Sequence, residues 1–141
     1  MLRWTAKLRD YLRPERNGAL GEMSVLALAH VGDAVFELMA RTWLSGCGAA
    51  TAKKLHSGAV ALVSAKSQAT AAERVLPSLR DDELAVYKRG RNAHPNTAPH
   101  GSICGEYHSA TGIEALFGYL YLSGRAERLN EIFGLIVGDA E

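Results

Sequence analysis

The sequence predicts an all-α domain. Apolar residues recur at three- and four-residue steps, glycine and proline separate these stretches, and no segment alternates apolar and polar residues as a half-buried strand does. With 48% hydrophobic residues and only 4 prolines among 141 residues, the chain has enough apolar surface for a packed core. We therefore expect one domain, residues 20–138, preceded by a basic N-terminal extension, residues 1–19.

The first predicted helix covers residues 20–44. Its apolar positions follow helical spacing, and the Gly-Cys-Gly sequence at 46–48 ends it. These positions are Met23, Ala27, Val31, Ala34, Val35 and Leu38. An alanine-rich second helix is expected over residues 51–72, and Pro77 interrupts the chain after it.

The remaining elements follow in order. Residues 81–91 predict a third helix, because acidic residues open it and basic residues close it, which complements the helix dipole. Residues 92–108 contain two prolines and two glycines and predict a long surface loop. Two further helices are predicted over residues 111–123 and 126–137, with Gly124 between them.

Overall charge indicates no particular partner. Lys and Arg total 16 against 15 Asp and Glu, so any site for a polyanion must come from local clustering. Cys47 and Cys104 are too few for a disulfide framework. Charged residues interrupt the apolar positions of residues 1–16 and 25–44, so we expect neither a secretion signal nor a membrane span of about 20 residues. We therefore expect a cytoplasmic protein without membrane insertion.

Two acidic residues stand among apolar helical positions. Asp33 follows Gly32 in mid-helix, where glycine costs about 1 kcal/mol relative to alanine, and such a glycine permits close helix approach. Glu114 is flanked by small residues that would let another helix bring it against Asp33. Two such carboxylates repel unless a proton or cation lies between them. Mg²⁺ is the predicted cation, because it binds one or two carboxylates together with water and phosphate oxygens.

Each of these residues has a structural alternative. Thr111 and Glu114 fit a capping box, in which Glu114 only satisfies a backbone amide at a helix start. Glu37 is expected to pair with Arg41 on a solvated helix face, and His30 is expected to be an interior or interface histidine. A zinc site is a further alternative but matches no zinc-finger spacing; its ligands would be His94, His100, Cys104 and His108.

Three ordered blocks carry a family resemblance. They are Leu26-Ala-Leu-Ala-His-Val-Gly-Asp33-Ala-Val-Phe-Glu37, Lys88-Arg-Gly-Arg-Asn92 and His108-Ser-Ala-Thr-Gly-Ile-Glu114-Ala-Leu-Phe-Gly-Tyr-Leu-Tyr-Leu122. Together they resemble Mini-ribonuclease III, the subgroup of the ribonuclease III family that has a catalytic domain but no double-stranded-RNA-binding domain. Leu55-His56 and residues 63–69 are also similar to segments of that subgroup, so the resemblance covers residues 20–137.

The resemblance implies a homodimeric, ribonuclease III-like endonuclease domain that cleaves both strands of double-stranded RNA with Mg²⁺, leaving 5′-phosphate and 3′-hydroxyl ends. It also implies maturation of the large-subunit (23S) ribosomal RNA precursor, and it leaves open a ribosomal protein as a further partner. Asp33 and Glu114 are the implied catalytic and metal-binding pair. Larger family members carry further carboxylates at positions matching Leu26, Ala29 and Thr111, where this chain is apolar or neutral.

Basic residues that end the third predicted helix are the expected phosphate contacts, since duplex RNA is recognised mainly through shape, 2′-hydroxyl and phosphate groups. Their structural alternative is to complement the helix dipole. The predicted RNA-binding residues are Lys88, Arg89, Arg91, Asn92 and Lys66, with Lys53 and Lys54 as weaker candidates.

Two other function classes stay open. One is a catalytically inactive helical dimer that binds RNA or ribosomal assemblies, and the retained acidic pair counts against it. The other is a metal-dependent phosphohydrolase that acts on nucleotides, which typically needs several His and Asp ligands on facing helices. The sequence contains no P-loop, nucleophile elbow or dinucleotide glycine fingerprint, which counts against nucleotidase, esterase and dehydrogenase functions.

Overall fold

The fold is built around one buried helix. The computed structural model describes residues 10–15, 20–93 and 104–138, and its regular elements there are all helical, which confirms the predicted all-α class. The α-helices are α1 (Val25–Gly46), α2 (Ala52–Val63), α3 (Ala65–Val75), α4 (Asp81–Arg91), α5 (Cys104–Leu122) and α6 (Ala126–Val137). Two 3-10 turns, Leu20–Glu22 and Leu76–Ser78, precede α1 and α4. Within the described segments, no helix is both long and apolar enough to cross a membrane.

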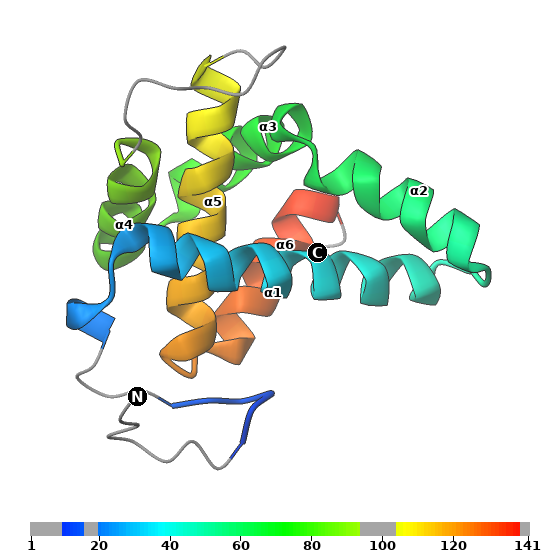
Figure 1. Cartoon of the computed structure of the whole chain (residues 1–141), viewed down its shortest axis with the longest axis horizontal. Helices are drawn as coiled ribbons and strands as arrows, with labels where there is room; N and C mark the ends of the chain where they lie inside the picture. Colours follow the sequence, from blue (N-terminus) through cyan, green and yellow to red (C-terminus); the bar gives the residue numbers. More distant parts are fainter. Residues whose placement is uncertain (1–9, 16–19, 94–103, 139–141) are drawn as a thin grey trace, which may run out of the picture.

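Helix α5 lies at the centre of this arrangement. Figure 1 shows α1 crossing it, with α4 and α3 on other sides and α6 running back from its C-terminal end. Its middle is buried on several sides, because Ile113, Ala115, Leu116, Phe117 and Leu120 are all without measurable exposure. A helix that is apolar nearly all round belongs in a core.

Aromatic rings join the helices around α5. The Phe36 ring of α1 lies 5.0 Å from the Phe117 ring of α5 and 5.8 Å from the Phe133 ring of α6, centroid to centroid. Tilted and edge-on ring pairs at such distances add stabilisation beyond their buried area. The three rings therefore fix α1 and α6 against the same part of α5.

Several predicted helix boundaries are confirmed. Helices α4 and α6 occupy residues 81–91 and 126–137 as predicted. The first helix begins later than predicted, because Ser24 caps it: the Ser24 Oγ accepts a hydrogen bond from the Ala27 backbone N–H at 3.1 Å. Residues 20–22 form a 3-10 turn instead.

The single helix predicted over residues 51–72 is wrong. Ser64 has an extended backbone with a ψ of 149°, so it ends α2 and starts α3. Its Oγ accepts a hydrogen bond from the Ser67 N–H at 3.2 Å, which offers the chain a new helix start at this point. An alanine-rich composition did not reveal this break, because serine is compatible with both a cap and a helix interior.

The predicted loop over residues 92–108 is too long at its C-terminal end. Asn92 caps α4, residues 94–103 lie outside the described part, and α5 already begins at Cys104. Gly105 is therefore helical rather than a breaker, and α5 begins well before the predicted start at residue 111. Small residues weaken a helix without excluding it when neighbouring elements pack on it.

A buried ion pair joins α4 to α6. Glu83 is completely buried and accepts hydrogen bonds from the Arg128 Nε and Nη2 at 2.8 Å each, and from the Arg80 N–H at 2.8 Å. Burial alone would raise the Glu83 pKa, but the hydrogen bonds from Arg128 and Arg80 outweigh it and lower the pKa. The guanidinium of Arg128 also donates to the Ser78 carbonyl at 2.7 Å, so α4, α6 and the turn before α4 are held together.

One polar side chain in the core finds no partner among the described residues. Gln68 in α3 is 1% exposed, and neither its Nε2 nor its Oε1 makes a hydrogen bond within residues 10–15, 20–93 and 104–138. Leaving a buried amide unpaired costs about 1–3 kcal/mol. We therefore expect the Gln68 amide to lower the stability of the fold.

We predict that Gln68→Met, which keeps the side-chain shape and removes the polar atoms, stabilises the protein by about 1 kcal/mol. Glu73→Met, at an exposed position of the same helix, is the control and should change stability little. Thermal or urea unfolding measures both. A Gln68→Met protein less stable than the wild type would mean that a buried water satisfies the amide.

Candidate active site

The backbones of α1 and α5 touch at two glycines. A β-carbon at Gly32 would lie 1.6 Å from the Glu114 carbonyl oxygen, and one at Gly118 would lie 1.9 Å from the Leu28 carbonyl oxygen. Such distances are impossible for real side chains, so only glycine fits at either position. The close approach predicted from Gly32 is confirmed, and the small residue that meets it is Gly118.

This crossing brings the two candidate carboxylates together. Asp33 directly follows Gly32 and is exposed, whereas Glu114, whose carbonyl meets Gly32, is partly buried. Burial first and the Asp33 charge second raise the Glu114 pKa to about 7. Asp33 therefore lies near enough to Glu114 for its negative charge to disfavour ionisation of the Glu114 carboxyl group.

The pair suits a hard divalent cation. A carboxylate pair kept close by backbone packing is stabilised when a cation replaces the proton of Glu114. Mg²⁺ accepts one or two protein carboxylates and completes its coordination with water and phosphate oxygens. In the described segments, no group of three or more His, Cys, Asp or Glu residues is placed to hold a metal, so Asp33 and Glu114 would need those outside ligands.

The capping-box alternative for Glu114 is wrong. Thr111 lies in the interior of α5, and its Oγ1 donates a hydrogen bond to the Tyr107 carbonyl at 3.1 Å. Glu114 therefore lies well inside the helix, away from any helix start. The Thr111 backbone amide, also inside the helix, needs no side-chain cap there.

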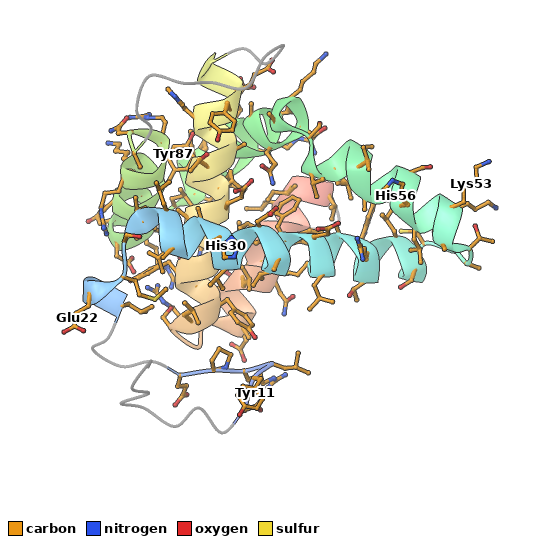
Figure 2. The ribbon with its side chains drawn as sticks, in the orientation of Figure 1. Tyr11, Glu22, His30, Lys53, His56 and Tyr87 are labelled. Atoms are coloured by element: carbon orange, nitrogen blue, oxygen red, sulfur yellow. The ribbon has the colours of Figure 1, made fainter. Side chains whose placement is uncertain are left out.

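Two other polar residues of α1, Glu37 and His30, are not part of the acidic pair formed by Asp33 and Glu114. The expected Glu37–Arg41 ion pair is confirmed, with the Arg41 Nη2 2.7 Å from the Glu37 Oε1. His30 is exposed rather than interior, and Figure 2 shows it on the side of α1 turned toward the viewer, in front of α5.

For the zinc alternative, two of the four proposed ligands, His94 and His100, lie outside the described residues.

Four of the predicted RNA-binding residues are together at the end of α4. Lys88, Arg89 and Asn92 are exposed, while the Arg91 guanidinium lies 5.9 Å from the centre of the Tyr87 ring. The Arg91 Nε also donates to the Asn92 Oδ1 at 3.3 Å. This cation–π contact holds Arg91 partly against the protein surface.

A second glycine contact brings the basic end of α4 close to the acidic pair. A β-carbon at Gly90 would lie 2.9 Å from the Ala115 Cβ, and one at Gly112 would lie 2.7 Å from the Tyr87 ring. Ala115 is the residue after Glu114, so the α4 terminus packs beside the helix turn that carries Glu114.

The fifth predicted residue, Lys66, is not part of this group. It is exposed on α3 and lines a groove of about 300 Å³ with Ser67, Thr70 and Arg74. The Arg74 Nη1 donates to the Ile136 carbonyl at 2.9 Å, which closes one side of that groove. Lys66 therefore belongs to the surface between α3 and α6.

Comparison with known proteins identifies the family. Residues 26–125 match the ribonuclease III domain. The chain belongs to the ribonuclease III family. It is an endoribonuclease of that family, and the match spans α1 to the turn after α5, so it includes both candidate carboxylates.

Relatives within the family are Mini-ribonuclease 3 proteins, which confirms the subgroup. The chain is 43% identical to the one from Symbiobacterium thermophilum over 107 residues, covering 76% of this chain and 82% of that protein. It is 39% identical to the one from Synechocystis over 128 residues, covering 89% and 85%. A crystal structure of a Fusobacterium nucleatum protein matches with a TM-score of 0.76 at 28% identity, covering 86% of this chain and 99% of that one.

We predict that Gly32→Ala and Gly118→Ala each destabilise the protein by about 3 kcal/mol or more, because a β-carbon would separate the two helix backbones. Gly46→Ala is the matched control. Gly46 ends α1, and nothing lies within 4 Å of the position that a β-carbon would take there, so alanine should be neutral or stabilising. Urea unfolding compares the three variants, and a stable Gly32→Ala protein would show that the backbone contact is dispensable.

Metal-free stability should depend on pH through Glu114. Its folded pKa, about 7, lies above the ordinary value of 4.5, so the folded state binds this proton more tightly than the unfolded state. The contribution of Glu114 is therefore most favourable below pH 4.5, falls as the pH rises to about 7, and then stays constant. A shift of this size corresponds to a change on the order of 3 kcal/mol.

Unfolding measured in a chelator between about pH 5 and pH 8 tests this dependence. Glu114→Gln should flatten that part of the profile and stabilise the protein at the alkaline end, whereas Glu127→Gln, at an exposed position, should leave the profile unchanged. A profile that is the same for wild type and Glu114→Gln would mean that Glu114 titrates normally.

Proposed function

We propose that this endoribonuclease cleaves double-stranded RNA with Mg²⁺ and that Asp33 and Glu114 are its catalytic and metal-binding residues. The observation that supports this most directly is the α1–α5 contact, which forces a partly buried carboxyl group and an exposed carboxylate into one region. Unfavourable charge proximity of this kind is typical of a functional site rather than of a stabilising one.

The chemistry follows from the residues present. A bound Mg²⁺ would supply an activated water and neutralise charge that builds on the scissile phosphate. Glu114 must lose its proton to act as a ligand, and with a pKa of about 7 it can do so near neutral pH when a cation takes the proton's place. Asp33, being exposed, lies where a phosphate from solution can approach. No protein nucleophile is required for hydrolysis by this route.

We further propose that RNA phosphates are bound by Lys88, Arg89, Arg91 and Asn92 at the end of α4. Their position beside the Glu114 turn supports a contact close to the cleavage site. Lys66, on α3, would contact only RNA that extends around the domain. Residues 1–19 remain, in this proposal, an extension to a catalytic domain of residues 20–138.

A homodimer is the proposed working form. The acidic pair of one copy would cleave one RNA strand. The second copy, related by a twofold axis, would supply an equivalent pair for the other strand. The outer side of α1 carries Leu26, His30, Ala34 and Leu38 at four-residue steps, and Leu26 and Leu38 are 45% and 56% exposed. An exposed apolar stripe on the helix that also carries Asp33 is suited to a second copy of the chain.

For the biological substrate, we propose the large-subunit (23S) ribosomal RNA precursor in the cytoplasm. This rests on the membership in the Mini-ribonuclease 3 group, whose members from Symbiobacterium thermophilum and Synechocystis are similar over most of the chain. A ribosomal protein bound to that precursor is the proposed accessory partner. Cleavage of a precursor transcript, with and without ribosomal proteins, tests both proposals.

Substrate class is tested with purified protein and labelled duplex RNA, single-stranded RNA and a nucleotide mixture, each with Mg²⁺ or with a chelator. Cleavage of the duplex alone, and only with Mg²⁺, is the expected result. Binding without cleavage would indicate the inactive RNA-binding dimer, and hydrolysis of nucleotides would indicate a phosphohydrolase.

We predict that Asp33→Asn and Glu114→Gln each lower turnover by more than about 100-fold, since each removes a metal ligand. Both proteins should melt at the wild-type temperature or above it, because one carboxylate no longer repels the other. Glu37→Gln, which breaks only the ion pair with Arg41, is the control and should cleave normally. Near-normal turnover of either ligand variant in Mg²⁺ would exclude the proposed site.

Leu38→Glu should convert the protein to a monomer, because it places a charge in the proposed apolar interface. Val60→Glu replaces a comparably exposed side chain on α2, 52% exposed, and should leave the dimer intact. Light scattering at working concentration reports the mass of each protein. A wild-type monomer that still cuts both strands would rule out the dimer.

A further inference from the structure

Acidic residues are missing from a long part of the chain. Between Glu37 and Glu73 there is no Asp or Glu, although the chain as a whole has 15 of them. The same stretch contains four positively charged residues, namely Arg41, Lys53, Lys54 and Lys66. The near-zero charge of the whole chain therefore conceals a separation of charge along it.

Most of this stretch forms an arm of two helices. The C-terminal half of α1 and the whole of α2 pack on each other where the Leu44 side chain meets Gly58, with 2.9 Å between the Leu44 methyl carbons and the position of a Gly58 β-carbon. Figure 1 shows this pair extending away from α4 and α5. We call residues 41–63 the basic arm, and Figure 2 shows Lys53 at its free end.

The basic arm lies on the same side of α1 as Asp33. Leu44 follows Asp33 by eleven residues, which is close to three full turns at about 3.6 residues per turn. The two side chains therefore leave α1 in nearly the same direction, and α2, which packs on Leu44, lies along the Asp33 side of the helix. At about 1.5 Å per residue, the end of α1 is about 20 Å from Asp33.

The positive charges of the basic arm that are not in an ion pair among the described residues lie at its tip, in the first turn of α2. Arg41 is already paired with Glu37. Lys53 and Lys54, in the first turn of α2, are exposed and have no ion pair among the described residues. His56 is exposed further along α2. Two unpaired lysines are flexible point charges, which bind phosphates without regard to base sequence.

We propose that the tip of the basic arm, Lys53 and Lys54, binds the phosphate backbone of the RNA duplex beyond the cleavage site, about 20 Å from the acidic pair. The inference rests on the proposed cleavage of double-stranded RNA. A duplex is a stiff rod with phosphates along its length, so a cation held on a rigid two-helix arm can meet it at a fixed distance from the bond that is cut. The contact makes affinity depend on duplex length.

Binding of two duplexes with the same cleavage site tests the proposal, measured in Ca²⁺ or a chelator by fluorescence anisotropy over a range of salt concentrations. The long duplex extends well beyond about 20 Å on each side of the site, and the short one ends before that distance. Lys53→Ala/Lys54→Ala should weaken binding of the long duplex and lower its salt slope by up to about 0.9 for each phosphate that is no longer bound. Affinity for the short duplex should stay unchanged.

Arg13→Ala/Arg80→Ala removes the same charge from the other end of the molecule, where both residues line a cavity beside the start of α6. This control should bind both duplexes as the wild type does, and unfolding curves check that both double variants are folded. Equal binding of the long duplex by wild type and the lysine variant overturns the inference, as does an equal loss of affinity for both duplexes.

The outcomes for the inference and for the proposed function are distinct. Wild-type protein that cleaves duplex RNA, together with a lysine variant of unchanged affinity and salt slope, overturns the inference alone. Wild-type protein that neither binds nor cleaves duplex RNA overturns the proposed function and the inference together.

Discussion

Contact between two helix backbones determines the rest of this structure. Gly32 and Gly118 remove the side chains that would otherwise hold α1 and α5 a full helix diameter apart. The same contact sets the direction in which Asp33 leaves α1 and the depth at which Glu114 is buried. Packing and chemistry are thus specified by one pair of glycines, and neither carboxylate could be placed independently of the core.

The position of Glu114 has an energetic cost that other contacts must offset. A partly buried carboxyl group beside Asp33 is less stable when ionised, and the pKa of Glu114 is raised for this reason. Stabilisation comes from elsewhere in the domain: the Phe36, Phe117 and Phe133 rings in the core, and the Glu83–Arg128 pair between α4 and α6. The site is therefore held together by interactions that take no part in its chemistry.

Sequence periodicity predicted the elements that have clear ends. Acidic and basic termini marked α4, and the mid-helix Gly32 correctly indicated a close crossing. The single helix predicted over residues 51–72 was wrong because serine is compatible with two structural positions. Ser64 would fit a helix interior, but in the structure it caps the end of α2 and the start of α3. The start of α5 was missed because Gly105 suggested a loop, whereas packing around α5 sustains a helix there. Local sequence patterns cannot predict contacts between residues far apart in the chain, and nothing near Glu83 indicates its partner Arg128. The capping-box alternative for Glu114 also needed the structure, because it is excluded by the position of Thr111 inside α5.

The paired glycines also constrain how such a domain can change over evolutionary time. A substitution at Gly32 or Gly118 damages the folded chain itself, so it is removed by selection for a stable protein even where cleavage is not needed. Loss of either carboxylate leaves the crossing intact. A descendant that keeps the fold but gives up catalysis is therefore expected to retain both glycines and to differ at the acids, which makes the glycines markers of ancestry and the acids markers of activity.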